Sequence, residues 1–87
     1  MQITVKKATE SEKLAMATQP TWECGSSDSI WYCDTETEWL IVNGEATLEY
    51  DGTSVNVGVG DFVTFPKGLS YNFKATNPFK HHYVSLH

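Results

Sequence analysis

Three side chains could act as an acid, a base or a nucleophile: Cys33, Tyr71 and His82. A cysteine thiol beside an imidazole is a common pairing of nucleophile and base. A cysteine in an apolar stretch also packs as a small hydrophobic residue, and we favour this interpretation for Cys33. These residues are therefore catalytic candidates, and the sequence alone leaves the catalytic residues unknown.

The adjacent histidines His81 and His82 cannot both face the interior of a sheet protein. Side chains alternate along a strand, so at most one imidazole points inward. We expect one ring to pack against aromatic side chains and the other to lie at the surface. If one is functional, His82 is the predicted base beside Cys33. The third histidine, His87, ends the sequence, and we expect it to be disordered.

Cys24 and Cys33 are the only cysteines. Their spacing matches no common zinc motif, in which paired ligands lie about two to four residues apart. In a cytosolic protein, two such cysteines are expected to stay reduced rather than form a disulfide.

The composition predicts one domain, residues 1–87, with enough apolar side chains for a core: 40% are hydrophobic and 13% aromatic. The net charge is −5 and there is no arginine, so a nucleic-acid partner is not expected. No apolar run approaches the roughly 20 residues that span a bilayer, and the N-terminus lacks the apolar centre of a signal peptide. We therefore expect a cytoplasmic protein with no membrane partner.

Residues 1–20 predict a strand and a short helix. Residues 2–7 alternate in hydrophobicity, which indicates an edge strand. Thr9 and Glu12 have the spacing of a helix capping box ahead of residues 13–17, and Pro20 is expected to end the helix. No other segment indicates a helix.

Residues 21–86 predict short strands joined by tight turns, because β-branched and aromatic runs are bounded by Gly, Pro, Asn and Asp. The expected strands cover residues 21–24, 30–33, 37–42, 45–50, 53–57, 62–65, 69–73 and 80–86. With the N-terminal strand this gives eight or nine strands. A closed or nearly closed barrel is favoured because closure removes aggregation-prone sheet edges.

Asn43-Gly44 and Asp51-Gly52 each separate two expected strands. Both dipeptides favour a type I′ hairpin turn, in which the two central residues take positive φ. The sequence therefore predicts an antiparallel meander of residues 37–42, 45–50 and 53–57.

Two blocks of sequence carry a resemblance to a known family. The first runs from Trp31-Tyr32-Cys33-Asp34 to residues 40–44, and the second is the stretch GDFVTFPKGL at residues 60–69. Both resemble the cupin superfamily, and more narrowly the small single-domain cupins similar to the ethanolamine-utilisation and ureidoglycine aminohydrolase group. Trp22 and residues 80–83 also fit the narrower group. The resemblance covers residues 21–86 and implies an all-β, cupin-type jelly-roll β-barrel with one short N-terminal helix.

The resemblance also implies where a metal would be held. Metal-binding cupins resemble one another in two histidines and a glutamate before the glycine of the first block, and one histidine after the Pro-x-Gly turn. These positions fall within residues 30–33, at Thr37 and at Tyr71, so the usual ligands are missing. We therefore expect no metal and no other cofactor. A non-standard site stays open, with candidates Cys33, Tyr71, His81, His82 and either Glu36 or Glu38.

The candidate ligand-binding residues follow from strand alternation. If Thr37 faces the interior, Trp39 does too, while Glu36 and Glu38 face solvent. The aromatic residues would either fill the core, which we favour, or line a pocket for a planar or sugar-like ligand. The predicted ligand-binding residues are Trp31, Thr37, Trp39, Tyr71, Phe73 and His82.

Three functions remain open. The first is a cupin that binds a small polar or planar metabolite at the mouth of the barrel without the usual metal. The second is an enzyme, an isomerase or aminohydrolase by analogy with the family, that uses the candidate catalytic residues. The third is a non-catalytic structural homodimer, whose interface would contain outward Leu40 and Val42 beside Ile3 and Val5. We rank binding first, and we expect a homodimer in each case.

Overall fold

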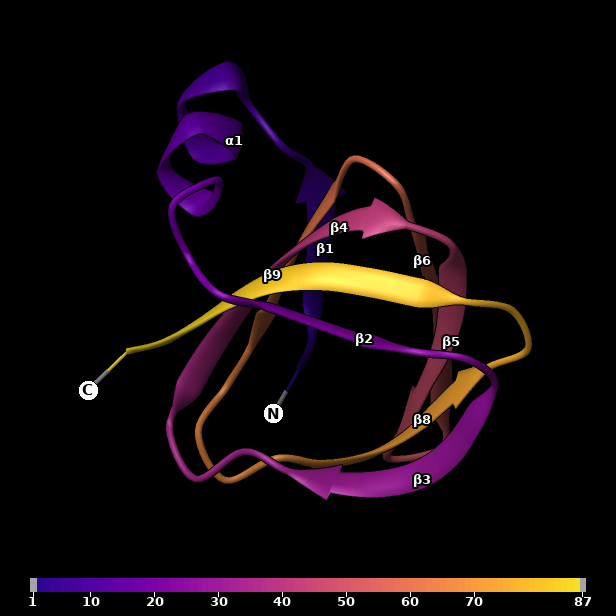
Figure 1. The fold of residues 1–87 in the computed structure, drawn as a ribbon. Helices are drawn as coiled ribbons and strands as arrows, with labels where there is room; N and C mark the ends of the chain where they lie inside the picture. Colours follow the sequence, from indigo (N-terminus) through magenta and orange to yellow (C-terminus); the bar gives the residue numbers. More distant parts are fainter. Residues whose placement is uncertain (1, 87) are drawn as a thin grey trace.

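The computed structural model describes residues 2–86, and His87 therefore lies outside the described residues. Within residues 2–86, one helix and nine strands follow one another (Figure 1). Their bounds are β1 Thr4–Lys7, α1 Glu10–Met16, β2 Thr21–Cys24, β3 Ser27–Tyr32, β4 Glu36–Asn43, β5 Glu45–Tyr50, β6 Thr53–Gly58, β7 Asp61–Phe65, β8 Ser70–Ala75 and β9 Phe79–Leu86.

The strands form two antiparallel sheets that face each other. One sheet has the order β1-β7-β4-β9-β2 and the other has the order β3-β8-β5-β6. Figure 1 shows β9 and β2 on one side of the interior and β3 and β8 on the other. The predicted all-β barrel with one short N-terminal helix is confirmed, and β1 joins the barrel by pairing with β7.

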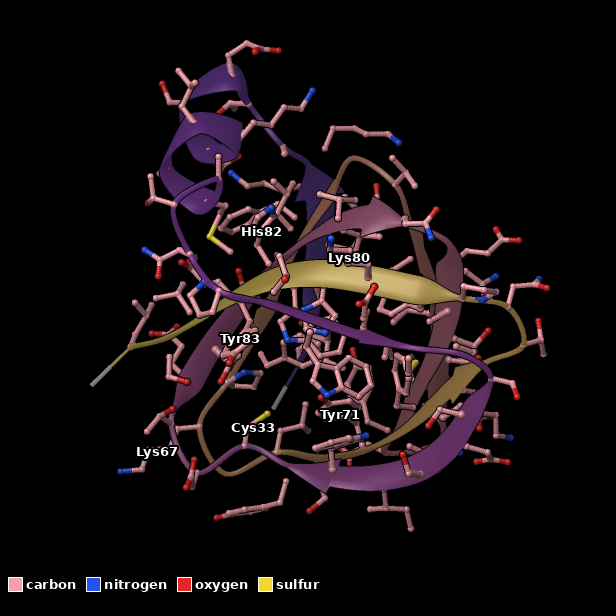
Figure 2. All side chains as sticks on the ribbon, in the orientation of Figure 1. Cys33, Lys67, Tyr71, Lys80, His82 and Tyr83 are labelled. Carbon is pink, nitrogen blue, oxygen red and sulfur yellow. The ribbon has the colours of Figure 1, made fainter. Side chains whose placement is uncertain are left out.

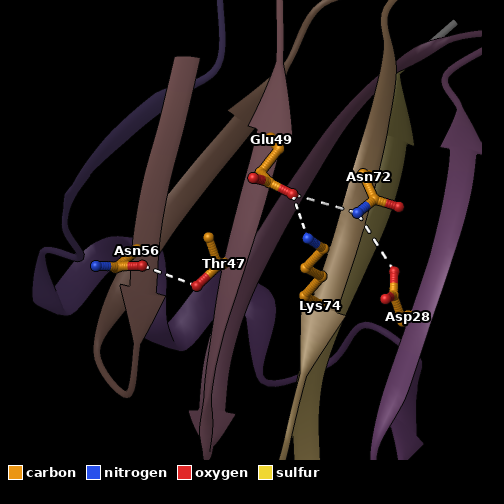
Figure 3. A network of polar contacts seen from close by, with 6 residues as sticks. All are labelled: Asp28, Thr47, Glu49, Asn56, Asn72 and Lys74. Atoms are coloured by element: carbon orange, nitrogen blue, oxygen red, sulfur yellow. Dashed lines mark hydrogen bonds and ion pairs between the residues drawn. The ribbon is translucent and has the colours of Figure 1, made fainter. Parts of the chain in front are cut away.

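Alternation along the strands separates a packed interior from a polar outer face. On β5, Ala46, Leu48 and Tyr50 are buried, whereas Glu45, Thr47 and Glu49 point outward. Figure 3 shows how polar groups pair across this outer face. Glu49 accepts a hydrogen bond from Asn72 and pairs with Lys74 at 2.8 Å, Asn72 also donates to Asp28, and Thr47 donates to Asn56. The predicted polar face of residues 45–50 is therefore present.

The Asp51-Gly52 hairpin is confirmed. Both residues take positive φ, 48° and 74°, and the turn joins the paired strands β5 and β6. Two positive φ values are the requirement of a type I′ turn, which matches the right-handed twist of the flanking strands.

The predicted Asn43-Gly44 hairpin is wrong. β4 pairs with β7 and β9, whereas β5 pairs with β6 and β8, so the chain crosses between the two sheets at this point. Gly44 does take a positive φ of 80°, but Asn43 does not. A Cβ on Gly44 would collide with the carbonyl oxygen of Pro78. Glycine is therefore required at position 44 by its positive φ and by the close approach of the Pro78 carbonyl, not by a hairpin turn. The predicted meander is not formed.

Helix α1 covers part of the outer face of the five-stranded sheet. Thr9 accepts a hydrogen bond from the Glu12 backbone, and the Glu12 carboxylate accepts one from the Thr9 backbone, which confirms the capping box. Glu12 also pairs with Lys6 at 2.8 Å, which ties the helix to β1. The helix ends at Met16, before Pro20. Of residues 2–86, no helix is long and apolar enough to cross a membrane.

Most of the interface predicted for a dimer is covered within the chain. Leu40 is buried with Met16 and Phe62 beneath α1, and Ile3 and Val5 pack toward the main core. Val42, the fourth residue of that predicted interface, is 38% exposed. The homodimer stays a prediction, without the continuous apolar face expected for it.

Gly44→Ala should destabilise the protein by at least about 3 kcal/mol, because positive φ and a clash with a carbonyl oxygen act together. Gly52→Ala is the matched control, since its φ is also positive but its Cβ would meet nothing within 4 Å. Backbone strain alone should lower the free energy of unfolding of Gly52→Ala by about 1 kcal/mol. Urea unfolding measures both, and equal losses would contradict the assigned crossing.

Candidate functional site

A cavity of about 260 Å³ lies between the two sheets. Its wall is mostly aromatic and contains all three tryptophans of the chain. The lining residues are Trp22, Trp31, Tyr32, Cys33, Asp34, Thr37, Trp39, Tyr71, Phe73, His81 and Tyr83. Figure 2 shows Cys33 and Tyr71 in the space between β2 and β3.

The strands direct these side chains into the cavity by alternation. Thr37 and Trp39 point inward from β4, Tyr71 and Phe73 from β8, and Trp31 pairs with Tyr71 across β3 and β8. Trp39 is 7% exposed, whereas Trp31 is 43% exposed. Trp39 therefore forms the floor of the cavity and Trp31 lies at its mouth.

Cys33 is fixed in the wall of the cavity by the turn that contains Pro66 and Gly68. The Cys33 backbone N–H donates to the Leu69 carbonyl at 2.9 Å, and the Gly68 N–H donates to the Cys33 carbonyl at 2.7 Å. Burial, with the nearby Asp34 carboxylate, raises the pKa of the Cys33 thiol. A raised pKa leaves little thiolate at neutral pH, so Cys33 is a poor nucleophile in this conformation.

His81, and not His82, is the histidine that lines the cavity. His82 lies on the opposite face of β9, toward α1 (Figure 2), and its Nδ1–H donates to the Gln19 carbonyl at 2.9 Å. The predicted placement of His82 beside Cys33 and Tyr71 is therefore wrong. The strand begins at Phe79, so Phe79, His81 and Tyr83 share the inner face.

His81 is buried in an aromatic environment. Its ring stacks on Trp39, with centroids 3.9 Å apart and an interplanar angle of 17°. The ring also lies near Trp22, at 5.5 Å between centroids. Burial, only partly offset by a hydrogen bond to the His82 carbonyl, lowers the pKa of His81 to about 4. His81 is thus a neutral imidazole at pH 7.

The same contact assigns the tautomer of His81. Its Nδ1 lies 3.3 Å from the carbonyl oxygen of His82, and a carbonyl oxygen can only accept a hydrogen bond. Nδ1 therefore carries the proton, and Nε2 keeps a lone pair that can accept a hydrogen bond.

The closed end of the barrel is filled by the rings beyond Trp39. Phe65 and Phe79 lie 4.5 Å and 6.2 Å from Trp39, measured between ring centroids, and both are fully buried. Phe73, which also contributes to the cavity wall, meets Trp39 nearly at a right angle, 84°, and is 1% exposed. One end of the barrel is therefore packed while the other is left open.

Five of the six predicted ligand-binding residues line this cavity, and the sixth, His82, does not. The prediction of ligand-binding residues missed Trp22, Tyr32, Asp34, His81 and Tyr83. Trp22 belongs to a short edge strand and meets His81 in register across β2 and β9. The alternation of Phe79, His81 and Tyr83 was the available signal, because two apolar rings on one face mark it as the inner one.

The sequence matches the family model of the EutQ-like cupin domain over residues 11–83. The chain belongs to the EutQ-like cupin family. Among curated proteins, none matches this cupin.

Solved structures show the fold of this cupin. A DUF861 family protein from Thermotoga maritima is 31% identical to it, with a TM-score of 0.91 over 98% of this chain and 100% of that one. A putative ethanolamine utilization protein Q from Salmonella typhimurium LT2 is 15% identical, and the EutQ protein of Clostridium difficile is 18% identical. Both have a TM-score of 0.71, and both alignments cover 95% of this cupin. They cover 68% of the Salmonella protein and 66% of the Clostridium protein. The jelly-roll fold is confirmed.

The donor set of the cavity does not fit the metal site of metal-binding cupins. Thr37 and Tyr71 stand where the resemblance places a glutamate and a histidine, and burial raises the pKa of the Tyr71 phenol, which disfavours the phenolate. Within residues 2–86, no three His, Cys, Asp or Glu side chains converge in a way that could hold a metal ion. The outward direction of His82, Glu36 and Glu38 removes the other candidates for a non-standard site.

The buried His81 predicts a loss of stability in mild acid. Its pKa is about 4 in the folded state and 6.5 ordinarily, so between these values the unfolded state binds more protons. The free energy of unfolding should therefore fall by roughly 2–3 kcal/mol as the pH is lowered from 6.5 to 4. Urea unfolding at a series of pH values measures this change.

His81→Phe keeps a ring against Trp39 and should remove this contribution, whereas His82→Gln leaves His81 intact and should retain it. A wild-type pH dependence in His81→Phe would show that His81 is not the responsible group.

Proposed function

We propose that this cupin binds a small polar or planar metabolite in the cavity, in the cytoplasm and without the usual cupin metal. The observation that carries the proposal is the cavity itself, about 260 Å³ with all three tryptophans in its wall. Ligand pockets are concave and mostly apolar with a few polar groups, and they span roughly 300–1,000 Å³. A cavity just below that range suits a compact ligand.

The polar groups in the wall support recognition rather than the predicted catalysis. Asp34, His81 and the Tyr71 hydroxyl offer distinct hydrogen-bonding groups in an aromatic surrounding. The raised pKa of Cys33 and the outward position of His82 argue against the proposed enzyme. Binding therefore remains the first-ranked function.

A cavity-filling variant tests the proposal. In a thermal-shift screen of small polar and planar metabolites, at least one compound should raise the melting temperature of the wild type. Thr37→Phe places a ring in the cavity, and the affinity of this variant for that compound should be about tenfold or more lower. Thr21→Phe is the matched control, because Thr21 is exposed on the outer face of β2. The affinity of Thr21→Phe for the same compound should stay within about twofold of the wild type.

Equal binding by wild type and Thr37→Phe would place the ligand elsewhere and contradict the proposal. A screen without any stabilising compound would also contradict it.

A further inference from the structure

We propose that two copies of this chain pair edge to edge through β3, antiparallel to each other, with the two-fold axis at Ile30. This gives the predicted homodimer an interface that does not involve Leu40, which α1 covers. The proposal does not depend on a ligand in the cavity. Three observations carry it: the free backbone edge of β3, the exposed apolar side chains at that edge, and the positions of the carboxylates along the strand.

The backbone of β3 presents free hydrogen-bonding groups along one side. The strand lies at the end of the sheet β3-β8-β5-β6, and among the described residues only β8 pairs with it (Figure 1). Both backbone groups of Cys33, the residue after β3, bond toward the turn that leads into β8. Backbone groups alternate in direction along an antiparallel strand, so the groups that face away from β8 belong to Asp28, Ile30 and Tyr32. A further strand can bond to these three residues.

Apolar side chains lie at this free edge. Ile30 is 78% exposed and Tyr32 is 64% exposed, and Trp31 between them is 43% exposed. The neighbouring outer face of the sheet is polar, since Lys74 of β8 pairs with Glu49 of β5 (Figure 3). The exposed apolar surface of this sheet is therefore concentrated on the strand whose edge is free.

The edge of the other sheet at β1 is protected from such pairing. β1 ends in Lys6 and Lys7, whose ammonium groups pair with Glu12 and Asp61. Charged side chains, lysine above all, keep a second strand from adding to a free edge. Residues 29–32 of β3 include neither a charged residue nor a proline. The edge of β3 is therefore open to a second strand.

The carboxylates select one register for two copies. With the axis at Ile30, the two isoleucines form a hydrogen-bonded pair, and Asp28 lies opposite the partner's Tyr32. The phenol can donate a hydrogen bond to that carboxylate. With the axis at Trp31, Asp28 would lie opposite the partner's Asp34, and like charges directly opposite each other are destabilising. The strand therefore complements a second copy of itself, as a two-fold interface requires.

The axis at Ile30 also covers more of the exposed apolar surface than an axis one residue earlier. An axis at Ser29 would put Tyr32 opposite the partner's Ser26, which precedes β3. With the axis at Ile30, Trp31 lies beside the partner's Ser29 on the inner face of the sheet. Because Trp31 lies at the mouth of the cavity, the partner's β3 forms part of that mouth.

Two lysine substitutions test the interface and its register. Ile30→Lys places two lysines opposite each other at the axis and should raise the dissociation constant of the dimer about tenfold or more. Tyr32→Lys places each lysine opposite the partner's Asp28, and its dissociation constant should stay within about threefold of the wild type. Leu14→Lys is the control for the added charge, because Leu14 is 73% exposed on α1, and it should dimerise as the wild type does.

Sedimentation equilibrium of the full chain over a range of concentrations measures each dissociation constant, and urea unfolding shows that each variant is folded. Amide hydrogen exchange of the wild type locates the interface without any substitution. The amides of Asp28, Ile30 and Tyr32 should exchange about tenfold or more slowly in concentrated than in dilute protein. The amides at the free edge of β6 should exchange equally in both.

A wild type that stays monomeric at about 1 mM would overturn the proposal. A dimer that Ile30→Lys leaves intact, or one without protection of the β3 amides, would place the interface elsewhere and overturn it too. Equal weakening by Ile30→Lys and Tyr32→Lys would overturn the register. None of these outcomes bears on ligand binding in the cavity, which Thr37→Phe tests separately.

Discussion

The contact between Trp39 and His81 determines most of what is distinctive in this barrel. The two rings stack at 3.9 Å, and the indole also touches Phe65, Tyr71, Phe73 and Phe79. Stacked and edge-on aromatic pairs add about 0.5–1.5 kcal/mol beyond the area they bury, so this cluster contributes strongly to stability. Because Trp39 is large and central, it divides the interior into a packed end and an open end. The cavity is the open end.

This division links stability to function through single side chains. His81 is neutral because it is buried, and it is buried because it stacks on Trp39; the same burial leaves an acceptor atom where a ligand would sit. The backbone of Cys33 is held by the turn around Gly68, so this part of the cavity wall is also fixed. Helix α1 lies outside the barrel and covers Leu40, which keeps the helix away from the mouth.

Much of the fold could be predicted from local sequence, because strand alternation and turn chemistry are local properties. Asp51-Gly52 specified its hairpin correctly, and Thr9 and Glu12 specified the start of the helix. The hairpin predicted at Asn43-Gly44 was wrong, because a glycine with positive φ occurs at a crossing between sheets as well as in a hairpin turn. The contact of Gly44 with Pro78 distinguishes the two, and Pro78 is distant in sequence. Alternation also placed Thr37 and Trp39 correctly. His81 and His82 could be told apart only by the phase of their strand, which Phe79 sets.

The most direct test of this account is the stability of Trp39→Ala, measured by urea unfolding beside Trp31→Ala. Trp39 is 7% exposed at the centre of the ring cluster, and its loss should cost about 3–5 kcal/mol. Trp31 is 43% exposed at the mouth, and its loss should cost about 1 kcal/mol or less. A cost below about 1 kcal/mol for Trp39→Ala, or similar costs for both variants, would contradict the division of the barrel into a packed end and an open end.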